Sequence, residues 1–204
     1  LNGDPYKLYP HQLQSLRDWK DANYQGIFAL CTGSGKTVTA LHAASVLSQE
    51  HYNVERPFCL IVSVPYQVLA EQWVKTMAFF NIFPVRCWGG EKNWYPALSR
   101  RINNFILNPV NPAFLSIVVV DKTLRENQTF RKEMAKLDPE EILFIGDECH
   151  HHASQAFVEA IPKARYRIGL SATPWSIAEQ DEREILIGIY SNVVAYFGLE
   201  EALE

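Results

Sequence analysis

The chain of 204 residues has no apolar run near the roughly 20 residues that a membrane-spanning helix needs. Its N-terminal stretch also lacks the basic-then-apolar pattern of a secretory signal. Internal repeats and low-complexity tracts are absent from the sequence as well. We therefore expect a cytoplasmic protein without a membrane partner.

Cysteine is scarce, and no Cys-x-x-Cys pair is present. The four cysteines are Cys31, Cys59, Cys87 and Cys149. Three of them lie in or beside apolar runs, which predicts buried, reduced thiols rather than disulfides. An excess of positive charge is lacking too. The net charge of −4 argues against a protein that coats nucleic acid, but it allows a motor that contacts phosphates over one small face.

What the sequence does contain is a set of short apolar runs that alternate with helical patterns. The predicted strands are Gly26–Leu30, Phe58–Val64, Val85–Trp88, Leu115–Val120, Ile142–Asp147 and Arg167–Leu170. The predicted helices are Val38–Gln49, Gln67–Phe80, Tyr95–Leu107, Leu124–Lys136 and Ser154–Ile161. Several strands are almost continuously apolar, as expected for strands covered on both faces. The pattern predicts an α/β fold, a three-layer αβα sandwich around a mostly parallel sheet.

Open parallel sheets bind ligands at the carboxyl ends of their strands, so functional motifs should follow the predicted strands directly. The first such motif follows the run Ile27–Leu30 and precedes a helical pattern. It consists of Thr32, Gly33, Ser34, Gly35, Lys36 and Thr37. Glycines let backbone N–H groups turn toward phosphate oxygens, and the following helix adds the positive end of its dipole.

We expect this loop to bind ATP, with Lys36 reaching the β- and γ-phosphates and the Thr37 hydroxyl ligating Mg²⁺. The alternative is a glycine turn that enters a helix, with a lysine there by coincidence. The strand–loop–helix context favours the phosphate site.

The second motif is an acidic pair that follows the run Ile142–Ile145. Asp147 leaves a buried strand, where a carboxylate can hold Mg²⁺ through water. Glu148 is then placed to orient and deprotonate the attacking water. Together with Lys36, these two residues are the predicted catalytic groups.

A competing interpretation is that Cys149, His150, His151 and His152 bind zinc. Consecutive residues seldom direct their side chains to one metal ion, and the chain has no second ligand cluster. We therefore expect His151 and His152 to be polar residues on the turn after the strand.

The third motif is Gly169–Pro174, again after a predicted strand. Its hydroxyl residues, Ser171 and Thr173, can hydrogen-bond the Asp147–His150 segment and sense the γ-phosphate. The alternative is an ordinary Ser/Thr turn that ends at a proline. The order of the three motifs favours the functional interpretation, with His150, Ser171 and Thr173 as the coupling residues.

These three motifs resemble motifs I, II and III of superfamily-two helicases and translocases. The chain is similar to the first RecA-like motor domain of that superfamily over nearly its whole length. Leu30 stands where the strict phosphate-loop pattern has a glycine, and the form without that glycine is the helicase variant. The stretches Leu8–Gln12 and Val64–Trp73 are similar to the branch that holds restriction-enzyme motor subunits and excision-repair helicases.

The resemblance implies an adenine contact through Gln12, whose amide offers both a donor and an acceptor. Tyr9 stands where the family usually has arginine, so it either stacks on the base or packs against the protein. For Gln12 itself the alternative is a solvated helix residue.

Nucleic acid is the partner that the resemblance implies, with duplex DNA preferred. The implied contacts are Pro65, Tyr66, Gln67, Gly89 and Gly90, followed by Lys122 and Thr123. Backbone amides and short hydroxyls suit phosphate contacts that carry no sequence information. Trp88, Trp94 and Trp175 are better explained as buried or interface aromatics than as a stacking platform.

The resemblance also implies two parts. Residues 1–175 form the ATP-binding RecA-like domain, and 176–204 form a partly flexible extension toward a missing second RecA-like domain. Because that domain supplies arginine fingers, we expect this chain to bind nucleotide with little ATPase activity. The alternatives are a different phosphate-loop enzyme, whose kinase lid or guanine-reading motif is not found, and an RNA-dependent ATPase or nucleic-acid sensor.

Overall fold

The computed structural model describes residues 7–107, 113–174, 180–198, 200 and 201. Residues 1–6, 108–112, 175–179, 199 and 202–204, which include Trp175, lie outside this range. Among the described residues, no helix is long and apolar enough to cross a membrane.

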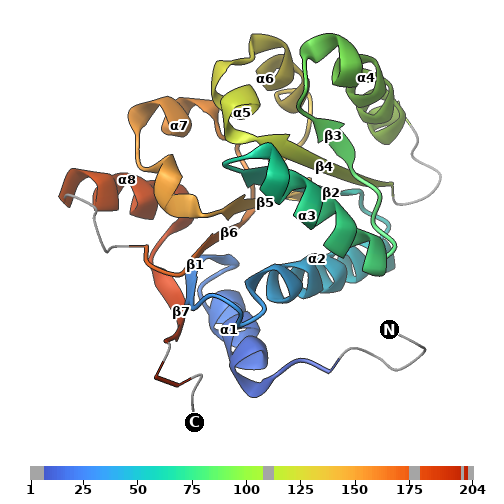
Figure 1. Cartoon of the computed structure of the whole chain (residues 1–204). Coiled ribbons are helices and arrows are strands. Elements are labelled where there is room, and N and C mark those ends of the chain that lie inside the picture. Colours follow the sequence, from blue (N-terminus) through green and yellow to red (C-terminus); the bar gives the residue numbers. More distant parts are fainter. Residues whose placement is uncertain (1–6, 108–112, 175–179, 199, 202–204) are drawn as a thin grey trace.

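A seven-stranded sheet with the strand order β3-β4-β2-β5-β6-β1-β7 forms the middle of the fold (Figure 1). The strands are β1 (Gln25–Leu30), β2 (Phe58–Val64), β3 (Val85–Cys87), β4 (Phe114–Val120), β5 (Ile142–Asp147), β6 (Tyr166–Ser171) and β7 (Val193–Phe197). Every neighbouring pair is parallel. The predicted parallel α/β sheet is therefore confirmed, and its six predicted strands are all present.

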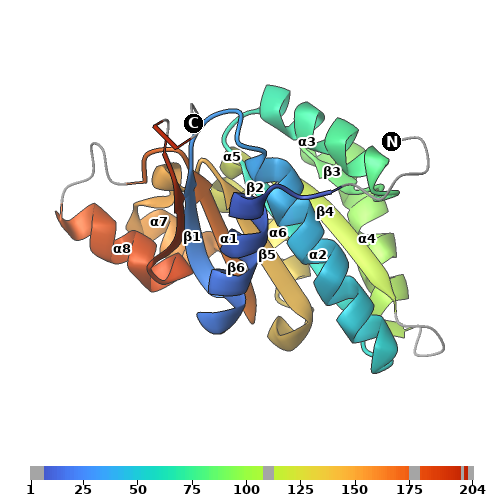
Figure 2. The ribbon, with the colours of Figure 1, turned by 90° about the horizontal axis from the view of Figure 1, so that it is seen from below.

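Helices cover both faces of the sheet, as Figures 1 and 2 show. One face packs on α1 (Pro10–Asp21), α2 (Lys36–Asn53) and α3 (Gln67–Phe79). The other packs on α4 (Glu91–Leu107), α5 (Asp121–Glu126), α6 (Gln128–Met134), α7 (Gln155–Ala160) and α8 (Gln180–Tyr190). Two short 3-10 helices, η1 (Pro139–Glu141) and η2 (Cys149–His152), flank β5. This is the predicted three-layer αβα arrangement.

The strand β2 shows why the runs are so apolar. All seven of its residues are buried. Cys59 and Ile61 belong to the core cluster under α4–α8, whereas Leu60 and Val62 belong to the cluster under α1–α3. Successive side chains of a strand point to opposite faces, so a strand between two helical layers needs apolar residues at its odd and its even positions alike.

Three helical features differ from the sequence prediction. The helix α1, with Pro10 in its first turn, was not predicted. The predicted helix Leu124–Lys136 is two helices, because the side chain of Asn127 accepts the backbone N–H of Phe130 and starts a new helix. In the extension 176–204, which was expected to be partly flexible, the helix α8 begins at Gln180.

The C-terminal part of the described chain packs onto the sheet. The strand β7, which was not predicted, pairs with β1, and α8 contributes Leu186, Ile189 and Tyr190 to the core. The division into residues 1–175 and 176–204 stays a prediction.

All strands run the same way, so the segments after β1, β5 and β6 meet at one edge of the sheet, where the three motifs lie.

Candidate functional site

The predicted phosphate loop connects β1 to α2. Gly33 and Gly35 have φ angles of 84° and 85°, a left-handed conformation that glycine adopts without steric cost. A β-carbon on Gly35 would also collide with the side-chain amide of Gln12. Thr32 is exposed beside Gly33, and Ser34 closes the loop by donating its hydroxyl to the carbonyl of Cys31 at 2.7 Å.

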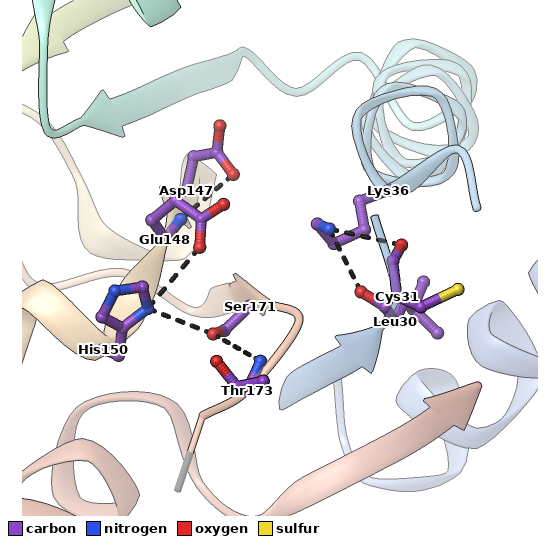
Figure 3. A network of polar contacts seen from close by, with 8 residues as sticks. All are labelled: Leu30, Cys31, Lys36, Asp147, Glu148, His150, Ser171 and Thr173. Atoms are coloured by element: carbon purple, nitrogen blue, oxygen red, sulfur yellow. Dashed lines mark hydrogen bonds and ion pairs between the residues drawn. The ribbon is translucent and has the colours of Figure 1, made fainter. Parts of the chain in front are cut away.

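Lys36 is the first residue of α2, and its ammonium group points back to the end of β1 (Figure 3). Nζ donates to the carbonyl of Leu30 at 3.1 Å and to that of Cys31 at 3.4 Å. Hydrogen bonds from an ammonium group to charged phosphate oxygens are stronger than those to neutral carbonyls. A triphosphate can therefore draw Lys36 away from these two carbonyls, with half-buried Thr37 next to it in the first helical turn.

Gln12 is fully buried against this loop from α1. Its amide nitrogen lies 3.3 Å from the carbonyl of Ser34 and 3.4 Å from that of Gly35, and its amide oxygen accepts the N–H of Tyr9 at 2.9 Å. Gln12 thus supports the phosphate loop directly, in contrast to the alternative of a solvated helix residue. The adenine contact stays a prediction. Tyr9 is exposed and stacks on His11.

Asp147 ends β5 and is 8% exposed. Its Oδ1 accepts the N–H of Glu148 at 3.0 Å, and its Oδ2 accepts the indole N–H of Trp73 at 2.7 Å. Burial raises the pKa of Asp147, and the hydrogen bond from Trp73 opposes that change. The positive charge of Lys36 also lowers the pKa of Asp147, by less than the hydrogen bonds do. Lys36 follows β1 and Asp147 ends β5, and β6 lies between these two strands.

Glu148 has a φ of 47°, a left-handed backbone conformation that costs free energy in a residue with a side chain. Its Oε2 lies 3.5 Å from Nδ1 of His150, and the same nitrogen lies 3.2 Å from the hydroxyl of Ser171 (Figure 3). The Ser171 hydroxyl also accepts the N–H of Thr173 at 3.2 Å. Burial lowers the pKa of His150. The structure brings the acidic pair and the third motif together, and their coupling role stays a prediction.

The three histidines after Glu148 point to different partners. His151 is exposed, as expected of a polar turn residue. His152 also lies on this turn, in η2, but unlike His151 it is fully buried. Its Nε2 lies 3.1 Å from Oδ1 of Asp121, and its Nδ1 contacts the Tyr190 hydroxyl. Nδ1 of His150 faces Ser171, whereas the ring nitrogens of His152 face Asp121 and Tyr190. The two imidazole rings therefore do not point to one common position, as two ligands of the same zinc ion would.

The residues implied as nucleic-acid contacts come from three segments and line one cavity of about 540 Å³. These residues are Pro65, Tyr66, Gln67, Gly89, Gly90, Lys122 and Thr123. Trp88 and Trp94 also contribute to the lining, and Trp94 is otherwise buried in the core. We call this cavity the groove. It lies at the ends of β2, β3 and β4, at the same edge of the sheet as the phosphate loop.

The contacts of four buried residues of the site, Trp73, Asp121, His152 and Tyr190, were not predicted from the sequence. Trp73 and Asp147 are 74 positions apart, and His152 and Tyr190 are 38 apart. Their local sequence carries no sign of these contacts, although Trp73 ends the stretch that resembled a family motif. Only the fold brings the partners together.

Comparisons with known proteins place this geometry in a family. The family model described as type III restriction enzyme, res subunit, matches residues 5–176. A search of curated proteins finds no match.

Solved structures with the same fold include two type ISP restriction-modification enzymes. LlaBIII bound to DNA is 18% identical with a TM-score of 0.71, and the match covers 98% of this chain and 16% of that one. A nuclease-deletion mutant of LlaGI in complex with a DNA substrate mimic is also 18% identical, with a TM-score of 0.72 and coverages of 97% and 20%.

The SWI2/SNF2 ATPase core of Sulfolobus solfataricus, in complex with dsDNA, is 19% identical with a TM-score of 0.61, and the match covers 91% of this chain and 36% of that one. The chain thus spans about a third or less of the solved chains it matches. It belongs to the family of the type III restriction enzyme res subunit and has the RecA-like fold of a superfamily-two helicase motor domain.

Proposed function

We propose that this chain is the ATP-binding motor domain of a translocase that moves along duplex DNA. The observation that carries the proposal is that Lys36, after β1, and Asp147, at the end of β5, lie at the same edge of the parallel sheet, with only β6 between these two strands. A phosphate-binding lysine and a buried carboxylate at one edge of the sheet are what ATP hydrolysis requires of the first domain.

The donors at this edge suit Mg²⁺, which prefers hydroxyl, carboxylate and water oxygens. Thr37 and Asp147 would hold the ion, which when bound neutralises charge on the phosphates. Lys36 binds the β- and γ-phosphates, and Glu148 takes the proton of the attacking water. His150, Ser171 and Thr173 link this acidic pair to the end of β6 through their hydrogen bonds.

Support for a nucleic-acid partner comes from the groove. Its lining combines backbone at two glycines with positive φ, Gly89 and Gly90, and the side chains of Lys122 and Thr123. Such groups suit contacts to a sugar–phosphate backbone. The three solved relatives described above were all determined with DNA, which favours DNA over RNA for this chain.

A second RecA-like domain of the same polypeptide would complete the site. Arginine fingers from such a domain contribute about a thousandfold or more to turnover. The 204 residues should therefore bind Mg²⁺–nucleotide and hydrolyse it slowly.

Titration with a fluorescent ATP analogue tests the nucleotide half of the proposal. Lys36→Ala should abolish binding, whereas Lys132→Ala, which removes an exposed lysine of α6, should leave binding unchanged. Equal binding by both variants would contradict the proposed phosphate site.

Steady-state ATPase assays of the protein with its second domain test the translocase half. Duplex DNA, single-stranded DNA and duplex RNA should be compared at matched nucleotide concentration. We expect duplex DNA to stimulate turnover most. Stimulation by RNA alone would favour the RNA-dependent sensor instead.

A further inference from the structure

We propose that Trp73 is a positioning residue that links the groove to the metal-binding carboxylate of Asp147. The inference rests on the proposed function, because it assigns Trp73 a role at that ATP site. Its basis is the hydrogen bond of 2.7 Å from the Trp73 indole N–H to Oδ2 of Asp147.

This hydrogen bond fixes a carboxylate that must keep one orientation. Two N–H donors from different elements bind Asp147, because Glu148 donates its backbone N–H to Oδ1 while Trp73 donates to Oδ2. Rotation of the carboxylate would break both bonds. Each oxygen keeps a second lone pair for a metal-bound water.

The indole also offsets the cost of burying the charge. Trp73 is 2% exposed and Asp147 is 8% exposed, so this hydrogen bond joins two buried side chains. Without the indole, Oδ2 would lose this N–H donor, and a buried charged oxygen that loses its partner is costly.

The helix that carries Trp73 begins in the groove. Tyr66 is the N-cap of α3, Gln67 is its first residue, and both line the groove. Trp73 follows six positions later on the same helix, about 9 Å along its axis at 1.5 Å per residue. A polynucleotide that moves the start of α3 therefore moves the donor that holds Asp147.

A buried indole can also serve packing alone, and the chain provides an example. Trp19 is 3% exposed and donates its N–H to the backbone carbonyl of Arg167 at 2.9 Å. Arg167 lies near the start of β6, away from the edge that holds Asp147. Trp19→Phe therefore reports the general cost of losing a buried indole hydrogen bond.

The test measures the Mg²⁺ concentration that half-saturates nucleotide binding, using the fluorescent analogue at fixed concentration. Trp73→Phe should raise this concentration about tenfold, the size expected for a lost hydrogen bond to a charged group. Trp19→Phe should change it by less than about twofold, since its acceptor is a neutral carbonyl. Binding without Mg²⁺ should be the same in both variants.

A double substitution shows whether Trp73 acts through the carboxylate. In the Asp147→Asn background, Trp73→Phe should have no further effect on the Mg²⁺ requirement. A full additional effect in that background, or equal behaviour of Trp73→Phe and Trp19→Phe, would overturn the inference. If Lys36→Ala abolishes binding while Trp73→Phe changes nothing, only this inference fails and the proposed function stands.

A measurement without substitution at Trp73 covers the case in which the variant does not fold. The chain has five tryptophans, whose indole N–H protons give separate NMR resonances. Asp147→Asn should shift one of them strongly, and Mg²⁺–nucleotide should shift the same resonance in the unaltered chain. If no indole resonance responds to either change, the link between Trp73 and the metal carboxylate is refuted.

Discussion

Nε2 of His152 lies 3.1 Å from Oδ1 of Asp121, which joins the segment that follows Asp147 and Glu148 to the first residue of α5. Both side chains are buried. Asp121 also accepts the hydroxyl of Ser63 at the end of β2, and the Tyr190 hydroxyl of α8 contacts the other ring nitrogen of His152. One buried network therefore connects the segment after the acidic pair to β2 and β4, two of the strands that end at the groove.

Tyr190→Phe should lower the free energy of unfolding by about 1–3 kcal/mol, because it leaves a buried ring nitrogen of His152 without its partner. In the tautomer that carries its proton on Nε2, beside the carboxylate of Asp121, Nδ1 of His152 accepts the proton of the Tyr190 hydroxyl. Urea denaturation measures the change. Tyr52→Phe, at a side chain that is 61% exposed, is the matched control and should be neutral.

Gly146→Ala and Gly188→Ala should change stability in opposite directions. A β-carbon on Gly146 would collide with the Tyr190 hydroxyl and would lie 2.9 Å from the ring of His152. We expect a loss of about 3 kcal/mol from this overpacking. Gly188 lies exposed in α8 with open space around it, so alanine there should stabilise the protein by about 0.5–1 kcal/mol. Equal effects in thermal denaturation would contradict the packing described around Tyr190.

The parts of the fold that were predictable are those with local signals. Each motif follows a strand whose apolar run is visible in the sequence, and glycines mark the turn before Lys36. The break at Asn127 was also encoded locally, in an asparagine that caps the following helix, but the helical pattern on either side masked it. The strand β7 was missed because its only paired strand, β1, lies far away in the sequence.

The candidate site was predictable to the same extent. Lys36, Asp147 and Glu148 stand in recognisable patterns, whereas the residues that support them do not. Trp73 could equally have been a core residue, and only the fold shows that its N–H meets Asp147. His152 looked like a polar turn residue because its acceptor, Asp121, follows a different strand.

Asp147→Asn should gain stability relative to the wild type as the pH rises from 3.8 toward 7, while weakening Mg²⁺-dependent nucleotide binding. Burial raises the pKa of Asp147 above its ordinary value of 3.8, so the charged form is disfavoured in the folded state. Above the raised pKa the wild type carries this penalty in full, and below 3.8 the carboxyl is protonated in both states and the penalty is absent. The difference in stability should therefore move in favour of the variant between pH 3.8 and pH 7. A cost that does not depend on pH is added to it, because the amide NH2 of asparagine cannot accept one of the two N–H groups that Asp147 accepts. A pH series of melting temperatures checks this, and a difference that stays constant between these pH values would contradict it.

Glu148→Gln, in the protein with its second domain, should keep nucleotide binding and lose at least about a hundredfold in turnover, the contribution of a general base. The substitution keeps the β-carbon, so the strained backbone at φ 47° is equally costly in both forms and only the carboxylate is removed. Glu159→Gln, at an exposed position of α7, is the control for loss of one negative charge. Single-turnover ATP hydrolysis separates the chemical step from binding and product release. Normal hydrolysis by Glu148→Gln would assign proton removal to another group, and His150, whose Nδ1 lies 3.5 Å from the Glu148 carboxylate, would be the next to test.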